Sequence, residues 1–246
     1  RDLHYPLRRQ RQMCIRDSLN YCVTSKKKSA NIIRAGNGNF FVHSNEKLHE
    51  LGNSFNNRLM LELNRSCTSK CRFCAASYVY KTFRIADKKK AMTFVDKAIS
   101  TRQGLALMGT SPGDVDFFDE ILEKTASSSI SVSLSSIKVK DINEKRIKLL
   151  KECGVKNITV AVESGCYNTR KGMLKDISNE EILNALMIVK EQSFKAKIYL
   201  MAGLPGTDHI EEAESVGNLL QWIKENNGLG EISLSVAPFV PKPLTP

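Results

Sequence analysis

The sequence has 246 residues, 41% of them hydrophobic, which is enough for one domain with a sizeable core but too little for two large ones. It contains no run of eighteen apolar residues and no secretory signal pattern at its start, so we expect no membrane insertion and a cytoplasmic, reducing setting. In such a setting the seven cysteines suit metal ligands, catalytic groups or buried apolar residues better than disulfides.

The formal net charge is +11, but residues 1–18 need separate treatment. The stretch "MCIRDS" at 13–18 matches a translated sequencing-library adapter, and the residues before it lack apolar periodicity, so we predict a disordered artefact over 1–18. That stretch carries a net charge of +3, which leaves about +8 for the rest. This charge favours an anionic partner such as RNA, although the spread of the lysines equally fits a solvated surface.

The remainder divides at about residue 58. Residues 19–57 are polar and irregular, and we interpret them as a lead-in segment, the remnant of an upstream region. Over 58–246 we expect the main domain, truncated at its C-terminus within a proline-rich segment. Short runs of apolar and β-branched residues alternate there with longer segments of helical period. The predicted strands are 58–64, 104–109, 129–135, 157–163, 196–203 and 231–239.

The segments between these strands contain helix signals. Asp141 with Glu144, and Ser178 with Glu181, have the spacing of a capping box, in which two side chains satisfy backbone N–H groups at a helix start. Cys153 shares the apolar face of the helix that precedes it, so we expect it in the core.

Alternating strands and helices predict an α/β fold of parallel β-α units, either an open doubly wound sheet or a β/α barrel. In both arrangements the loops that leave the C-terminal ends of the strands form the functional site. Polar or glycine-rich stretches stand at four such points in this sequence: 65–74, 110–114, 163–166 and 203–207.

The first of these loops holds Cys67, Cys71 and Cys74 in C-x3-C-x2-C spacing, without a further cysteine or histidine nearby. A structural zinc needs four protein ligands and would have to recruit Cys153, Cys166 or a distant histidine. A redox pair of the thioredoxin kind at "CRFC" leaves Cys67 unexplained. An iron–sulfur cubane on three thiolates, with one iron open to a substrate or cosubstrate, accounts for all three cysteines.

This motif, placed after the first strand of a six-unit β/α series, resembles the radical S-adenosylmethionine (radical SAM) superfamily. The likeness covers most of residues 55–246, through "LMLELNRSCTSKCRFCAASYVYKTFR", "ESGCYNTRKGMLKDISNEEI", "KIYLMAGLPGT" and "SVAPFVPKPLTP". It is closest to the Elp3/MiaB-like core of an uncharacterised branch often fused to a cobalamin-binding-like domain. It implies a partial (βα)6 barrel with parallel strands. Ser164 and Ser66 stand where those relatives usually have alanine and glycine, and Ser66 puts the loop conformation in question.

The resemblance implies a 4Fe-4S cluster on Cys67, Cys71 and Cys74, with SAM bound to the open iron. An electron from a donor such as flavodoxin or ferredoxin would cleave SAM to methionine and a 5'-deoxyadenosyl radical. That radical would abstract hydrogen from a substrate that the sequence does not identify. Cobalamin is expected only in the full-length protein.

The resemblance also places nine further residues around SAM: Phe73, Gly109, Thr110, Ser111, Glu163, Arg170, Gly203, Val236 and Ala237. Phe73 is expected to pack against the adenine, and Glu163 to hydrogen-bond the ribose or the amino group. Arg170 suits bidentate pairing with the SAM carboxylate. Each of these residues also has a plain structural interpretation as a turn, core or surface residue.

Two other functions stay open at this stage. An RNA-modifying methylthiotransferase would share this core, and only the basic charge speaks for it. A non-catalytic iron–sulfur or zinc protein, which would serve structure or electron transfer, comes from a different class. Iron content and the response of the cluster to SAM separate these functions.

Overall fold

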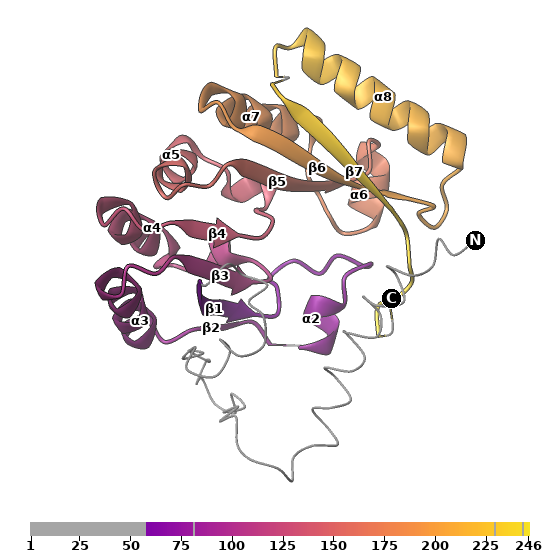
Figure 1. Ribbon diagram of the computed structural model, residues 1–246. Coiled ribbons are helices and arrows are strands. Elements are labelled where there is room, and N and C mark those ends of the chain that lie inside the picture. The colour runs from indigo at the N-terminus through magenta and orange to yellow at the C-terminus, as the bar shows by residue number, and fades with distance from the viewer. Residues whose placement is uncertain (1–57, 81, 229, 243) are drawn as a thin grey trace, which may run out of the picture. The chain divides into compact units, whose positions relative to one another are not determined.

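Parallel strands alternate with helices in the order that the sequence predicts. The computed structural model describes residues 58–80, 82–228, 230–242 and 244–246, which fall within one compact unit, 35–246. The predictions for 1–18 and 19–57 therefore lie outside the described residues. The parallel strands are β1 (Leu59–Arg65), β3 (Leu105–Gly109), β4 (Val132–Leu134), β5 (Asn157–Glu163), β6 (Lys195–Ala202) and β7 (Ile232–Pro238) (Figure 1).

The helices between the strands vary in length. Their bounds are α2 (Ala75–Val79), α3 (Lys88–Ser100), α4 (Phe118–Ser127), α5 (Glu144–Glu152), α6 (Tyr167–Gly172), α7 (Asn179–Glu191) and α8 (His209–Glu225). Short 3-10 turns at Pro112–Asp114 and Val139–Asp141 follow β3 and β4. In the described part of the chain, no helix combines the length and the apolar character needed to cross a membrane.

The strands form two sheets that together make a partial barrel, as the resemblance implies. One sheet has the order β2-β1-β3-β4 and the other β5-β6-β7. The sequence analysis did not anticipate β2 (Arg84–Ile85), a two-residue strand that runs antiparallel to the end of β1. Between β4 and β5 an isolated parallel bridge, Ile137 with Val160, continues the ladder.

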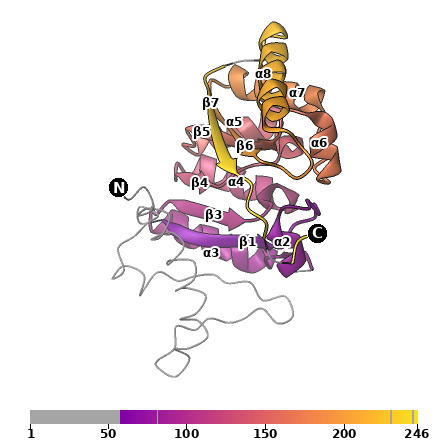
Figure 2. The same ribbon diagram turned by 90° about the vertical axis from the view of Figure 1, so that its right-hand side faces the viewer.

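Strands β1, β5 and β6 bury one face and leave the other partly open. On β1 the buried side chains are Leu59, Leu61 and Leu63, and on β6 they include Ile198 and Leu200. Helix α3 packs against β1 and α7 against β6, so these apolar faces point to the helices. Figure 1 shows α3, α4, α5 and α7 along one side of the strands, and the strands lie in front of them in Figure 2. The opposite, inner face is free to line a site.

The two capping boxes expected from the sequence have different outcomes. The box of Ser178 and Glu181 is confirmed at the start of α7, with both reciprocal hydrogen bonds present. The box at Asp141 is wrong, because Asp141 lies inside a 3-10 turn. Helix α5 instead begins after Asn143, whose side chain accepts a 2.9 Å hydrogen bond from the Arg146 N–H.

Strand β4 is shorter than the predicted 129–135. Helix α4 runs to Ser127, and Ser129 has a φ of 55°, which is incompatible with a strand, so the ladder begins only at Val132. Cys153 is confirmed as a core residue: its side chain is buried and lies 3.2 Å from the Thr125 hydroxyl.

Candidate functional site

The cysteine loop joins β1 to α2 at the carboxyl ends of the strands. Cys67, Cys71 and Cys74 are all partly exposed free thiols. Burial raises the pKa of Cys71, the charge of Lys175 lowers it, and Cys67 and Cys74 raise it again. The three thiols stand on one short loop, and the charges of Cys67 and Cys74 reach Cys71.

The three thiols of the cysteine loop suit a polynuclear iron–sulfur group by their number and chemistry. Among the described residues, no three Cys, His, Asp or Glu side chains converge on a position for one metal ion. In a 4Fe-4S cubane each thiolate binds a different iron, so the cysteines stand further apart than the ligands of one zinc. Three neighbouring thiols on one loop therefore fit the 4Fe-4S group that the resemblance implies.

Asn64, buried at the end of β1, fixes the start of the cysteine loop. Its Nδ2 donates to the Ser66 carbonyl at 3.0 Å and to Thr110 Oγ1 at 2.9 Å, and its Oδ1 accepts from the Ser111 N–H at 3.3 Å. A side chain at Gly109 would collide with Asn64 Oδ1. The stretch 109–111, expected to receive the SAM amino group, thus contacts the start of the cysteine loop through Asn64. Ser111 is only 2% exposed.

The ends of β1 and β5 each carry a residue with a strained backbone. Ser66 has a φ of 65° and Glu163 a φ of 74°, in the left-handed region that favours glycine. Each follows a shift in strand register, between Glu62 and Asn64 on β1 and between Ala161 and Glu163 on β5. Such residues cost about 1–3 kcal/mol each and cluster at functional sites. Ser66 therefore keeps the loop conformation that glycine would adopt more easily.

Lys175 joins the cysteine loop to the end of β5. Its Nζ lies 2.8 Å from Glu163 Oε1, and the two side chains are 14% and 13% exposed. The same Nζ lies 5.7 Å from the centroid of the Phe73 ring, and its charge lowers the pKa of Cys71. The sequence analysis missed Lys175. Its position beyond Gly172, where α6 ends, is the signal that could have revealed it.

Replacing Lys175 with methionine should raise the pKa of Cys71 further and leave Glu163 without its partner. We expect the alkylation of Cys71 by iodoacetamide to require a higher pH. Mass spectrometry measures the extent of alkylation at each pH. The free energy of unfolding should fall by about 1–3 kcal/mol, the cost of an unpaired, partly buried charge. Lys171→Met is the matched control. Lys171 Nζ lies 5.9 Å from the centroid of the Tyr167 ring, whereas Lys175 lies beside Phe73 of the cysteine loop. Equal shifts in both variants would contradict this assignment.

Arg170 has a different place from the one expected. Its side chain is fully buried and donates to the carbonyls of Ile177 (2.9 Å), Ser164 (2.8 Å) and Gly165 (3.0 Å), and to Asn179 Oδ1 (2.5 Å). A buried guanidinium that is engaged in this way does not reach a ligand. Its hydrogen bonds position the loop after β5.

Asp114 ties the other side of the cysteine loop to the turns after β3 and β4. Its Oδ2 accepts from Thr68 Oγ1 at 2.5 Å and from Lys138 Nζ at 2.6 Å, and its Oδ1 lies 3.2 Å from Lys140 Nζ. Burial alone would raise the pKa of Asp114, but the hydrogen bonds from Lys138, Thr68 and Lys140 outweigh it and lower the pKa to about 2. The carboxylate is therefore charged at neutral pH.

Replacing Asp114 with asparagine should destabilise the protein by about 2 kcal/mol at neutral pH. The folded-state pKa of Asp114 lies below its unfolded value, so this contribution is present above about pH 4 and is lost as the pH falls towards 2. The stability difference from wild type should shrink in that window, measured by denaturant unfolding. Asp96→Asn, which removes an exposed pair with Lys124, should change stability by less than about 1 kcal/mol. A difference that is constant from pH 7 to about pH 2 would contradict this prediction.

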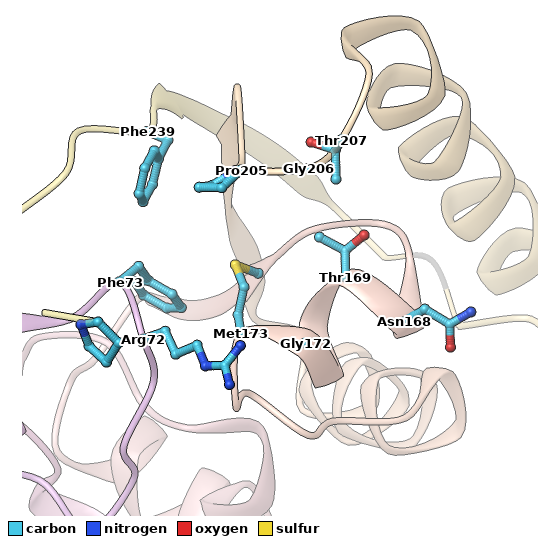
Figure 3. Close-up of a pocket in the computed structure, with 11 residues that line it drawn as sticks. Arg72, Phe73, Asn168, Thr169, Gly172, Met173, Pro205, Gly206, Thr207 and Phe239 are labelled. Atoms are coloured by element: carbon cyan, nitrogen blue, oxygen red, sulfur yellow. The ribbon is translucent and has the colours of Figure 1, made fainter.

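A pocket of about 610 Å³ opens beside the cysteine loop (Figure 3). Phe73 and Phe239 lie one above the other at one end, with Met173 and Pro205 beside them, and Gly206 adds backbone to the wall. The loop is held here because the Arg72 N–H donates to the Met173 carbonyl at 2.9 Å. The volume and the apolar lining are typical of a site for a small cofactor.

A second pocket, of about 460 Å³, shares Phe73 and Phe239 with the first. It extends along the inner face of the second sheet and is lined there by Glu163, Met201 and Ala237. Two pockets that meet at the same aromatic pair provide adjoining spaces at the mouth of the barrel.

Two predicted residues lie elsewhere. Val236 is on the opposite face of β7 from Ala237, in register with the helix-facing Leu200, and is 60% exposed. It therefore does not flank the second pocket. Gly203 has a φ of 79°, and its N–H donates to Glu212 Oε2 at 2.8 Å, so that amide is engaged by the chain itself.

The fold and the site define an α/β enzyme barrel with three thiols at its mouth. The sequence profile of the radical SAM superfamily matches residues 61–223, so the chain belongs to the radical SAM superfamily. Enzymes of this superfamily use a 4Fe-4S cluster and SAM.

Two curated relatives come from Methanocaldococcus jannaschii, and both are described as uncharacterized. MJ0966 is 29% identical over 195 residues, which cover 78% of this chain and 43% of the relative. MJ1620 is 30% identical over 115 residues, which cover 47% of this chain and 22% of the relative. The chain thus spans less than half the length of these relatives.

Several solved structures share the fold. The cobalamin-bound radical SAM methyltransferase TsrM from Kitasatospora setae has a TM-score of 0.59 at 9% identity, covering 72% of this chain and 36% of TsrM. Methylornithine synthase (PylB) has a TM-score of 0.53 at 16% identity, covering 78% and 57%. Coproporphyrinogen III oxidase (HemN) from Escherichia coli has 0.52 at 16%, covering 74% and 44%. At these identities the likeness shows the fold alone.

Proposed function

We propose that this chain is the core of a radical SAM enzyme that binds a 4Fe-4S cluster through Cys67, Cys71 and Cys74 and cleaves SAM reductively. The observation that supports the proposal is the position of Cys67, Cys71 and Cys74 on one short loop after β1, at the mouth of a partial β/α barrel. When bound, the cluster supplies the single electron that breaks the C5'–S bond of SAM. A flavodoxin or ferredoxin would be a suitable electron donor.

The residues of the chain prepare this site before SAM arrives. Asn64 and Asp114 fix the two sides of the cysteine loop. Phe73 and Phe239 offer faces for the adenine, and Lys175 offers a cation for the SAM carboxylate in place of Arg170. Pockets with little water protect a radical from quenching, which is the reason to place the reaction inside a barrel.

The site is tested by anaerobic reconstitution with iron and sulfide, followed by addition of SAM and dithionite. We expect about four irons per chain, a change in the EPR signal of the reduced cluster on SAM addition, and release of 5'-deoxyadenosine. Zinc at about one per chain, or an EPR signal indifferent to SAM, would instead favour the non-catalytic protein.

The overall transformation belongs to the whole protein. Residues 58–246 would be the radical SAM core, and 19–57 the remnant of an upstream region. TsrM is described with cobalamin bound, and we propose cobalamin only for the full-length form of this protein. RNA as a partner has support from the net charge alone.

A further inference from the structure

A row of three polar side chains crosses the inner face of the second sheet, below the mouth. Register pairs Thr159 on β5 with Lys197 on β6, and Lys197 with Ser233 on β7. Because strand neighbours in register point to the same side, the three side chains lie next to one another on this face. Their face is opposite that of Ile198 and other buried residues, which point to the helices.

The row lies in a concave site. A pocket of about 260 Å³ is lined by Thr159, Lys197, Ser233 and Tyr199. Lys197 Nζ lies 5.3 Å from the centroid of the Tyr199 ring, which fixes the amine within the pocket. Tyr199 also lines the 460 Å³ pocket above, so the two spaces adjoin along β6.

The amine of Lys197 carries a charge that the chain does not neutralise here. In the described ranges, Lys197 has no carboxylate within ion-pair distance, and the hydroxyls of Thr159 and Ser233 make no hydrogen bond. Lys195 and Glu231 also line this pocket, but they pair with each other at 2.5 Å, so the charge of Lys195 is neutralised and that of Lys197 is not. Two hydroxyl donors beside one uncompensated cation match the oxygens of a carboxylate or phosphate.

We propose that Thr159, Lys197 and Ser233 bind the anionic group, carboxylate or phosphate, of an elongated small-molecule substrate. Strand geometry places Lys197 about 13 Å below Met201, which lines the pocket beside Phe73. The reacting carbon would therefore lie at the mouth and the anion at the far end. The reaction rests on the proposed function, whereas the binding of the anion does not.

The test compares Lys197→Gln with Lys195→Gln in the full chain, at low salt and without phosphate buffer. Inorganic phosphate and glutarate are titrated separately, and the Tyr199 ring signals are followed by NMR. We expect saturable binding that weakens about tenfold or more in Lys197→Gln and stays within about twofold in Lys195→Gln. The better of the two probes identifies the class of anion.

Three results would overturn the proposal: no saturable shift in wild type, equal weakening in both variants, or an RNA oligonucleotide that binds through Lys197 when neither small anion does. The release of 5'-deoxyadenosine without substrate is measured in parallel in the wild-type protein, as a separate test of the proposed function. If that protein releases no 5'-deoxyadenosine, the proposed function fails, and the binding comparison still decides the anion site.

Discussion

Replacing Cys67, Cys71 and Cys74 together with alanine should reduce bound iron from about four per chain to nearly none. Thiolates are the protein's contribution to such a cluster, and residues 66–74 contain no histidine or acidic residue to take their place. Release of 5'-deoxyadenosine from SAM should fall to background. Iron and sulfide assays, with the EPR spectrum of the reduced protein, measure the first effect, and chromatography measures the second.

The matched control is Cys166→Ser. Cys166 precedes α6 close to the same mouth, and hydrogen bonds from Thr169 lower its pKa. If only the three loop cysteines bind the cluster, this variant should keep its iron and its activity. Equal loss of metal in Cys166→Ser would instead make Cys166 a fourth ligand and would contradict the open iron.

Replacing Arg170 with alanine should lower the free energy of unfolding by about 3–5 kcal/mol. The change leaves the carbonyls of Ser164, Gly165 and Ile177 buried without their donor. Arg170→Lys keeps the charge but cannot direct donors to all of these acceptors, so an intermediate loss is expected. Denaturant unfolding, with the slope checked for two-state behaviour, measures both variants.

Lys171→Ala, on the exposed side of the same short helix, is the control and should change stability by less than about 0.5 kcal/mol. The alternative is that Arg170 serves SAM by its charge. In that case Arg170→Ala would unfold like wild type and lose only affinity for SAM, and Arg170→Lys would bind SAM normally.

The order of the strands and the place of the cysteine loop could be predicted because both depend on local pattern. Apolar, β-branched runs such as 157–163 predict strands, and a site at their carboxyl ends follows from parallel order. The outcome at Asp141 marks the limit: its spacing to Glu144 was right for a cap, but Asn143 was nearer to the helix start. Competing caps separated by two residues differ little in free energy.

Side-chain direction was harder to predict. Arg170 and Lys175 are both cations close to the end of β5, and only the fold decides which is buried. The hydrogen bonds of Arg170 connect Ser164 to Asn179 across fifteen residues of chain, a contact that no local spacing reveals. Val236 and Ala237 differ in the same way, because neighbours on a strand point to opposite faces.

The isolated bridge between β4 and β5 leaves few backbone hydrogen bonds across that seam. The cysteine loop follows β1 of the first sheet. Glu163 ends β5 of the second sheet, and Lys175 lies between β5 and β6 of that sheet. Contacts at the mouth, such as the Arg72 N–H with the Met173 carbonyl, therefore span two blocks that the ladder itself joins weakly. A ligand that contacted both blocks would hold them together, and its binding would slow amide hydrogen exchange at residues 137 and 160.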